Sequence, residues 1–444
     1  MNYKNNMLDR KKIFLISLLA LFTSGLSAAL RATIAGDLQG NYLDAIDLTR
    51  STIMIGEILG VSFLGFAFTL FIASPLLDAI GMARLLVASA VCFIAGTLIV
   101  IFAESFASGA NIYWPLWVGM LLSGIGWGLV EGTTNPLTTS LYPEDKTNKL
   151  NILHAWWPAG LIVGGLAGVG LGSLDVSWKL QFALVLIPAV IYTLMIIGVV
   201  FPQTERAAAG ISMKDMFMEI FRQPSFFIWL GAMLLTAASE LAPGQLVDLV
   251  LTRTVGMDGI LLLVYVSGLM FVMRHFSGPI VKVLSPVGLL WCSCLLASIG
   301  LYLLSVANSP ITGILAATVW GLGVCYMWPT MLATTSELYP RGGSFFVGTM
   351  GATGALSITF VLPQLGAIFD RTKIEVAGSL EQFSALEGAP LDEALMHAAQ
   401  VTFQSIAILP AALLLVFGGL WWKNKSNGGY SSVAICDETA TTKQ

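Results

Sequence analysis

Charged side chains are scarce in this 444-residue chain. They make up 11% of it, against about 25% in soluble globular domains, while 56% of the residues are hydrophobic. The net charge is only -4 and no block of like charges forms a tail, so we expect no nucleic-acid partner. A chain this apolar is typical of a protein that crosses a lipid bilayer several times.

Cysteine is also rare and poorly placed for cross-linking. The five cysteines are odd in number; four lie in apolar stretches, and Cys436 lies in the polar C-terminal region. No disulfide framework is therefore expected, and Cys292 and Cys294 are too close together for a zinc site. The sequence also lacks an H-E-x-x-H pair, a phosphate-binding P-loop and a Ser/His/Asp arrangement. We expect no enzymatic activity, no metal and no cofactor, with a proton gradient as the energy source.

Long apolar runs recur along the whole chain. About 20 apolar residues cross the hydrocarbon layer as a helix, which pairs its own backbone groups. The basic N-terminal residues and the first run also fit a cleaved signal peptide, but the run continues to Ala35, which favours a membrane helix. We therefore predict an all-α membrane protein with twelve transmembrane helices. The segments are 13–35, 52–73, 83–103, 113–138, 150–172, 179–201, 226–250, 257–276, 287–306, 310–335, 344–367 and 399–422.

Lys and Arg are distributed unequally between the two sets of loops. Most of the 22 Lys and Arg residues, Arg274 among them, fall on the side that holds the N-terminus. Positive charge accumulates on the cytoplasmic side of membrane proteins, so both termini are predicted to be cytoplasmic. We expect a multi-pass monomer of the cell (inner) membrane, whose partners are the lipid bilayer and a small-molecule substrate such as a sugar.

An internal repeat divides the chain into two halves. Residues 124–143 (GIGWGLVEGTTNPLTTSLYP) align without a gap with residues 321–340 (GLGVCYMWPTMLATTSELYP). We predict an N-terminal six-helix half (1–202), a cytoplasmic linker (203–224), a C-terminal six-helix half (225–423) and a disordered cytoplasmic tail (424–444). Two such halves with the substrate held between them are an architecture of transporters.

The linker has the pattern of an amphipathic helix that lies on the membrane surface. Apolar side chains recur at helical spacing from Met213 to Phe221, whereas the charged residues, Glu219 among them, face away. Ser212 is placed to cap the first turn, and Pro224 to end the helix.

The connection between the second and third segments reads SPLLDAIGMARLL. It resembles the G-x-x-x-D-x-x-G-x-x-R pattern of the major facilitator superfamily, with Asp78, Gly81 and Arg84 at matching positions and Ser74 where the family prefers glycine. The resemblance implies the major facilitator fold and a latch between cytoplasmic helix ends that opens when the halves rock. An ordinary polar turn is the alternative.

A narrower resemblance covers parts of the fourth, fifth and tenth segments. Glu131, Asn135 and Pro136, together with the Trp-Pro-Thr sequence at 328–330, are similar to the fucose permease family of sugar:proton symporters. That resemblance implies proton coupling at Glu131 and a sugar substrate. The chain departs from the family in its first segment, where Arg31 is present and no carboxylate precedes Asp37.

Carboxylates inside apolar segments are the candidate proton-coupling residues. A charged carboxylate at the bilayer centre costs at least about 2.5–3.5 kcal/mol, so it normally faces the bundle interior or a water-filled cavity. Glu131 and Glu240 are such residues, and protonation would remove the penalty. A structural hydrogen bond or ion pair is the alternative for each of them.

Polar and aromatic side chains in the same segments are candidate substrate ligands. Asn135 lies one turn from Glu131, and Pro243-Gly244 predicts a break in the seventh helix. Arg31 would pair with Glu240 or Glu57 or reach the outer surface, whereas an unpaired Arg31 would favour an anionic substrate. Simple packing is the alternative for each tryptophan. The candidates are Asn135, Gln245, Arg31, His154, Trp127, Trp156, Trp157, Tyr326 and Trp328.

Glycines at every fourth position in the fourth and fifth segments predict closely packed helices. Taken together, these features predict a secondary active transporter of a small polar solute, with rocker-switch sugar:proton symport as the leading hypothesis. An organic-anion or drug transporter, working as a proton antiporter, is one alternative. A non-transporting membrane receptor is the other.

Overall fold

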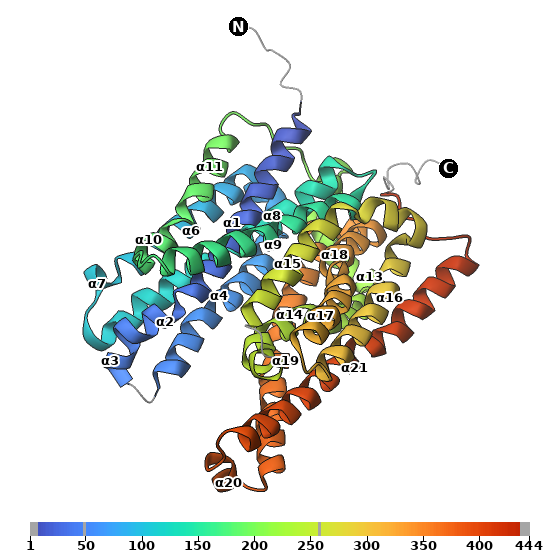
Figure 1. The fold of residues 1–444 in the computed structure, drawn as a ribbon. Coiled ribbons are helices and arrows are strands. Elements are labelled where there is room, and N and C mark those ends of the chain that lie inside the picture. The colour runs from blue at the N-terminus through green and yellow to red at the C-terminus, as the bar shows by residue number, and fades with distance from the viewer. Residues whose placement is uncertain (1–7, 48–49, 256–258, 436–444) are drawn as a thin grey trace, which may run out of the picture. The chain divides into compact units, whose positions relative to one another are not determined.

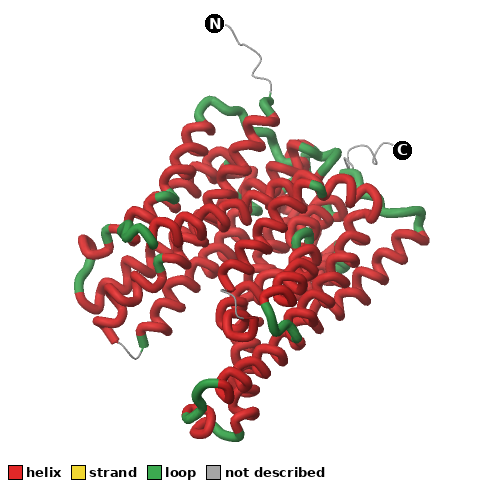
Figure 2. Tube along the Cα trace, in the orientation of Figure 1, coloured by secondary structure: helices red, strands yellow, loops and turns green. Residues whose placement is uncertain are grey.

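A computed structural model describes residues 8–47, 50–255 and 259–435, with side chains described except at 52, 244–255, 259–261 and 362. Every regular element in these ranges is helical (Figure 2), as apolar segments of this length must be to pair their backbone groups in lipid. The chain forms two compact units. The first comprises Met1–Pro224, Thr335–Ala352 and Val433–Gln444, and the second comprises Ser225–Thr334 and Thr353–Ser432.

The helices of the first unit follow the order of the apolar segments (Figure 1). The long ones are α1 (Arg10–Thr33), α4 (Ser51–Ala73), α6 (Met82–Ile101), α8 (Tyr113–Leu141), α9 (Lys146–Gly172) and α11 (Leu186–Ile196). The short ones are α2 (Ala35–Leu38), η1 (Gln39–Leu43), α3 (Asp44–Asp47), α5 (Leu77–Ile80), α7 (Ala103–Phe106), η2 (Gly109–Ile112), α10 (Trp178–Ala183), α12 (Glu205–Ala208) and α13 (Met213–Arg222).

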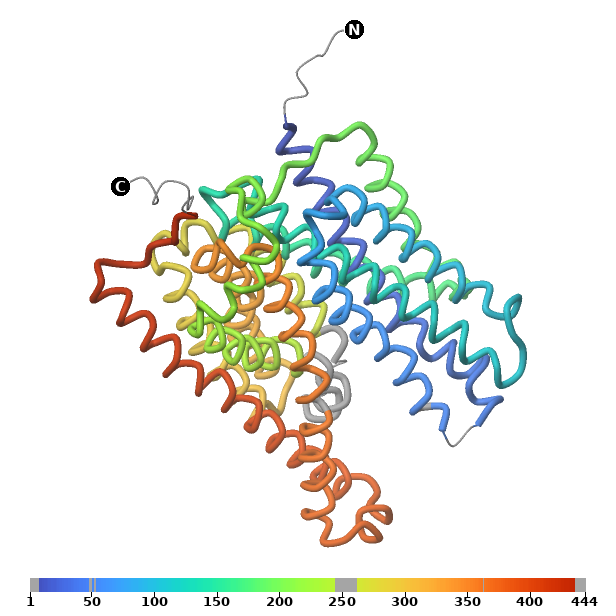
Figure 3. The backbone as a smooth tube through the Cα atoms, turned by 180° about the vertical axis from the view of Figure 1, so that it is seen from behind, coloured from blue at the N-terminus to red at the C-terminus, as the bar shows by residue number. Residues whose placement is uncertain are grey.

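Glycines determine how closely the helices of this unit approach. α9 lies along α1, and α8 packs against both α4 and α6 (Figures 1 and 3). A Cβ on Gly164 of α9 would lie 2.7 Å from the Cβ of Ala29 in α1, and a Cβ on Gly128 of α8 would lie 2.7 Å from the Phe66 carbonyl oxygen of α4. The close packing predicted from the glycine spacing is therefore confirmed.

The second unit continues with a further set of helices, all of them long except α20. They are α14 (Phe226–Val255), α15 (Gly259–His275), α16 (Ser277–Ser305), α17 (Pro310–Val324), α18 (Met327–Leu338), α19 (Gly343–Ala377), α20 (Leu380–Ser384) and α21 (Ala389–Ser426). The end of α18, the turn η3 (Pro340–Gly342) and the start of α19 belong to the first unit. α14 continues through Pro243 without interruption, so the break predicted there is wrong. α16 is kinked instead, at Ser285 (φ 61°), directly before Pro286.

Eleven helices in the described ranges are long and apolar enough to cross a membrane. They match eleven of the twelve predicted segments. The remaining segment, 257–276, contains a shorter apolar helix, Leu262–His275, next to the undescribed residues 256–258. The twelve-helix count and the cytoplasmic position of the termini therefore stay predictions.

The predicted linker helix is present as α13. Ser212 caps it, since its Oγ accepts a hydrogen bond from the Asp215 backbone N–H at 3.1 Å. Glu219, however, was predicted to face away with the polar residues, and this is wrong. Its carboxylate is buried and lies 3.7 Å from Arg341 Nε of η3, because η3 packs against this helix.

Candidate functional site

Glu131 is held inside the first unit by a tryptophan from its own helix. The carboxylate is 3% exposed, and its Oε1 accepts a hydrogen bond from Trp127 Nε1 at 2.9 Å, one turn away on α8. The Trp127 ring is nearly parallel to those of Phe66 and Trp157, at centroid distances of 3.9 and 6.1 Å. An indole N–H can donate both to a carboxylate and, more weakly, to the carbonyl oxygen of a carboxylic acid. This contact therefore holds Glu131 in place in either protonation state.

Asn135 continues the polar face of α8 by one turn and reaches α9. Its Oδ1 lies 2.9 Å from Nε2 of His154, and both residues are buried. Pro136 has no N–H, so the helical hydrogen bond to the Gly132 carbonyl is missing beside this pair. The structure thus brings together Trp127, Glu131, Asn135, His154 and Trp157 of the predicted residues. Trp156 lies on α9 with its ring 6.3 Å from that of Phe22 in α1.

Glu240 lies in a separate cluster, within the second unit. Its Oε1 pairs with Arg274 Nη2 at 2.9 Å, and its Oε2 accepts a hydrogen bond from the Trp328 backbone N–H at 3.1 Å. Tyr326, directly before α18, donates to the Met273 carbonyl at 2.8 Å, next to Arg274 in the chain. Tyr326 and Trp328 thus both border this ion pair. The structural ion pair, the alternative interpretation of Glu240, is present.

The partner of Glu240 is a residue that the sequence analysis did not connect with it. Arg274, which was counted with the cytoplasmic loops, is 2% exposed and paired, because α15 packs against α14. Its position two residues before the predicted end of the eighth segment concealed this role. The Arg31–Glu57 pair considered from the sequence is not found among the described residues, and Glu57 accepts a hydrogen bond from Tyr113 OH at 2.9 Å. Gln245 lies outside the residues whose side chains are described.

Arg31 itself is buried in the last turn of α1, with 5% of its surface exposed. Its Nη1 has no hydrogen-bond partner, and the described residues give this side chain no ion pair. Arg31 is thus not a snorkelling surface residue.

Asp78, the carboxylate of the predicted latch, contacts an arginine that lies outside the motif. Asp78 accepts hydrogen bonds from Thr204 Oγ1 at 2.8 Å and from the guanidinium of Arg206, which is buried. Arg84, the predicted partner, is exposed and donates to the Ile80 carbonyl one turn away at 3.3 Å. Gly81 has a φ of 96° between α5 and α6, a conformation that favours glycine. The linker residue Arg206 therefore takes the place that the motif suggested for Arg84.

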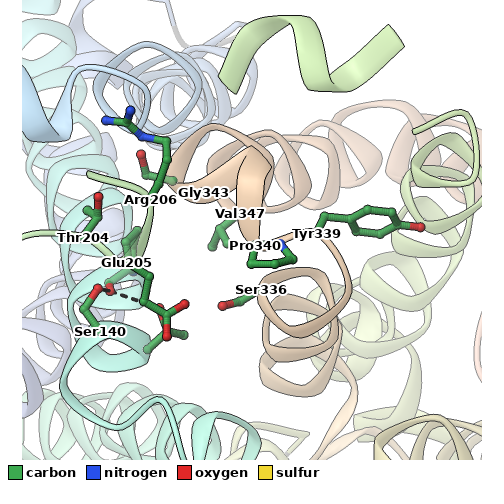
Figure 4. Close-up of a pocket in the computed structure, with 12 residues that line it drawn as sticks. Ser140, Thr204, Glu205, Arg206, Ser336, Tyr339, Pro340, Gly343 and Val347 are labelled. Atoms are coloured by element: carbon green, nitrogen blue, oxygen red, sulfur yellow. Dashed lines mark hydrogen bonds between the residues drawn. The ribbon is translucent and has the colours of Figure 1, made fainter. Parts of the chain in front are cut away.

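Next to the latch is a small cavity of about 20 Å³, room for roughly one water molecule (Figure 4). Thr204, Glu205 and Arg206 lie on one side of it, and Ser336 and Pro340 on the other. Pro136, the neighbour of Asn135, also lines it.

Two contacts of α9 reinforce this region. Lys146 Nζ lies 2.7 Å from Glu205 Oε2, and Thr147 Oγ1 donates to Glu337 Oε1 at 2.7 Å. The end of α8 is therefore enclosed by the linker, α9 and the start of α19, less than two turns from Asn135.

Comparisons with known proteins agree with this architecture. The family model described as Major Facilitator Superfamily matches residues 13–373. The E. coli fucose:proton symporter is matched over 98% of its length and 90% of this chain, with a TM-score of 0.65 and 16% sequence identity. A D-xylose-proton symporter is matched over 97% of its length and 92% of this chain, with a TM-score of 0.70 and 15% identity. The human organic anion transporter MFSD10 is matched over 100% of its length and 92% of this chain, with a TM-score of 0.69 and 12% identity. At these identities the structures show the fold alone.

A curated relative is matched over a shorter stretch. Myo-inositol transporter 1 of Saccharomyces cerevisiae is 25% identical over 149 residues, which are 33% of this chain. The match spans 24% of the yeast protein, about a quarter of its length.

Proposed function

This chain belongs to the major facilitator superfamily, and we propose that it is a sugar:proton symporter that works by rocker-switch alternating access. The names of its structural neighbours support this class of substrate, since two of them are proton symporters of fucose and xylose. The yeast relative, a transporter of myo-inositol, points to a similar polyol chemistry. We propose a monomer in the cell (inner) membrane with both termini in the cytoplasm.

The observation that carries the proposal is the buried Glu131 beside the Asn135–His154 pair. A buried carboxylate is costly when charged, so proton uptake at Glu131 lowers the free energy of an enclosed site. The Trp127 hydrogen bond is compatible with both protonation states and keeps the carboxyl group oriented. A proton can therefore be carried without rearranging the side chains around it.

Sugar binding would use the neutral polar groups one turn away. The Asn135 amide and the His154 ring each present donor and acceptor sites, which suit hydroxyl groups that both give and accept hydrogen bonds. The parallel rings of Trp127 and Trp157 provide flat apolar faces for the C–H surface of a sugar. In the second unit, we propose the paired Glu240 as a secondary proton site.

Uptake into proteoliposomes tests the proposal. With the transported sugar outside, the wild type should acidify the vesicle interior and accumulate sugar when a proton gradient is imposed. Glu131→Gln should keep sugar counterflow but lose proton-driven accumulation, because the amide does not bind a proton. Glu104→Gln, which replaces an exposed carboxylate of α7, is the matched control and should show the proton-driven accumulation of the wild type. Normal proton-driven accumulation by Glu131→Gln would refute the coupling role.

A further inference from the structure

We infer that the solute bound in the first unit carries a carboxylate, as a sugar acid does, and that this carboxylate pairs with Arg31. The inference rests on the proposed transport function and specifies its substrate class. It starts from a buried cation for which the described chain provides no counter-charge.

Three acidic residues of the first unit that could be considered as partners are engaged elsewhere or exposed. Glu131 accepts from Trp127, and Glu57 accepts from Tyr113. Asp37, the first carboxylate after Arg31, is exposed and has no ion pair in the described ranges. Burying a charge without a partner is strongly unfavourable, whereas buried charges in proteins are normally paired. We therefore expect the buried guanidinium of Arg31 to be neutralised by an anion from outside the chain.

Two other buried groups on α1 and α9 also have unfilled hydrogen-bonding capacity. Ser27 lies one turn before Arg31 on the same face of α1, is fully buried, and its Oγ has no partner among the described residues. On α9, Trp157 has a buried Nε1 to which the described residues likewise offer no hydrogen bond. Its backbone touches α1 at Gly25, where an added Cβ would lie 2.1 Å from the Trp157 carbonyl oxygen. From Gly25 to Arg31 the rise along α1 is about 9 Å.

The chemistry of these groups selects the ligand. Guanidinium and indole nitrogens only donate hydrogen bonds, so their partner must be rich in acceptors. The planar guanidinium fork matches a carboxylate, and hydroxyl or ring oxygens suit the serine and the indole. A sugar acid combines both kinds of acceptor. A phosphate ester carries about two negative charges near neutral pH, twice what one arginine neutralises, so a carboxylate is the better fit.

Thermal melts of the purified full-length protein with matched sugars test the inference. The pairs are D-glucose with D-glucuronate and D-galactose with D-galacturonate, together with D-gluconate and glucose 6-phosphate. In the wild type, at least one acid should raise the Tm at a concentration at least tenfold lower than its neutral partner. Arg31→Gln should weaken that response at least tenfold. Arg371→Gln, an exposed arginine of α19 paired with Glu375, is the matched control and should respond as wild type.

The ligand-free proteins supply a second readout. Because the substitution removes an unpaired buried charge, Arg31→Gln without ligand should melt at or above the wild-type temperature. A lower Tm would mean that Arg31 is satisfied within the protein, which overturns the inference. Four results of the ligand melts also overturn the inference. They are equal Tm shifts with acids and neutral sugars, acid-induced shifts that survive in Arg31→Gln, shifts with the phosphate alone, and no shift with any acid.

These outcomes separate the inference from the proposed function. Proton-coupled uptake of a neutral sugar without preference for the acid refutes the sugar-acid assignment and leaves sugar:proton symport intact. Conversely, Arg31-dependent binding of an acid that enters vesicles without proton movement refutes the symport proposal and supports the assignment of the ligand.

Discussion

His154 Nε2 lies 2.9 Å from Asn135 Oδ1 and joins α9 to α8 in the buried interior of the first unit. Because each side chain comes from a different helix, their hydrogen bond reports directly on how these helices pack. It also lies one turn from Glu131, the proposed proton carrier.

Removal of either member of this pair should weaken both stability and solute binding. Asn135→Ala or His154→Ala withdraws the hydrogen-bond partner of a buried polar group, at a cost of about 1–3 kcal/mol. The Tm should fall by roughly 2–4 °C per kcal/mol, and the solute affinity by about tenfold. The double variant should lose less than the sum of the single variants, because they share one interaction. Fully additive losses in Tm would show that the pair is not energetically coupled.

Arg206 and Arg84 should differ sharply on substitution. Arg206→Gln breaks a largely buried ion pair with Asp78, whereas Arg84→Gln removes an exposed side chain. We expect Arg206→Gln to lower the Tm and to speed the reaction of Ser140→Cys with a water-soluble thiol reagent, because Ser140 lines the adjacent cavity. The labelling is measured after replacement of the native cysteines. Similar labelling rates in Arg206→Gln and Arg84→Gln would contradict the assignment of the latch to Arg206 rather than to Arg84 of the motif.

Leucine at Gly164 should abolish transport by separating α9 from α1. A Cβ there would already lie 2.7 Å from the Cβ of Ala29, so the larger side chain forces the helices apart at a cost of about 1–3 kcal/mol or more. Gly170→Leu, on the same helix with open space around its Cβ, is the control and should retain transport and Tm. Equal Tm values for the two variants would contradict the tight packing at Gly164.

A pH-dependent contribution to stability is expected at Glu104. The hydrogen bond from Tyr42 (2.8 Å), followed by the hydrogen bond and charge of Lys179 (3.1 Å), lowers the pKa of the Glu104 carboxyl. A carboxyl group whose pKa is lower in the folded than in the unfolded state stabilises the folded protein at pH values above its unfolded pKa of about 4.3. This stabilisation is lost as the pH falls through the folded pKa. Because these groups are exposed, wild type should melt no more than about 3 °C above Glu104→Gln at pH 7.

The difference between these two proteins should shrink towards zero as the pH is lowered from 5 to 3, in melts of samples that stay folded at the lowest pH. A difference that stays constant over this range would show that the carboxylate charge does not stabilise this cluster.

Local features of the structure follow directly from the sequence. The length of the apolar runs specifies membrane-crossing helices, since backbone groups in lipid must pair within the segment. Helical periodicity places Asn135 on the face of Glu131, and the four-residue glycine spacing brings α9 against α1. The Ser212 cap is equally local, because its hydrogen bond spans three residues. In each case the deciding interactions lie within one helix or one repeating pattern.

Pairings between distant side chains were decided by the tertiary structure. Asp78 pairs with Arg206, 128 residues away, rather than with Arg84. Glu240 pairs with Arg274, Glu219 is buried against Arg341, and Arg31 has no ion-pair partner among the described residues. The sequence shows that these charges exist, but a charge has no preferred partner until packing sets distance and solvent exposure. Sequence alone therefore determined the helices, the repeat and the location of Glu131. Only the fold decided which of these charges pair with one another.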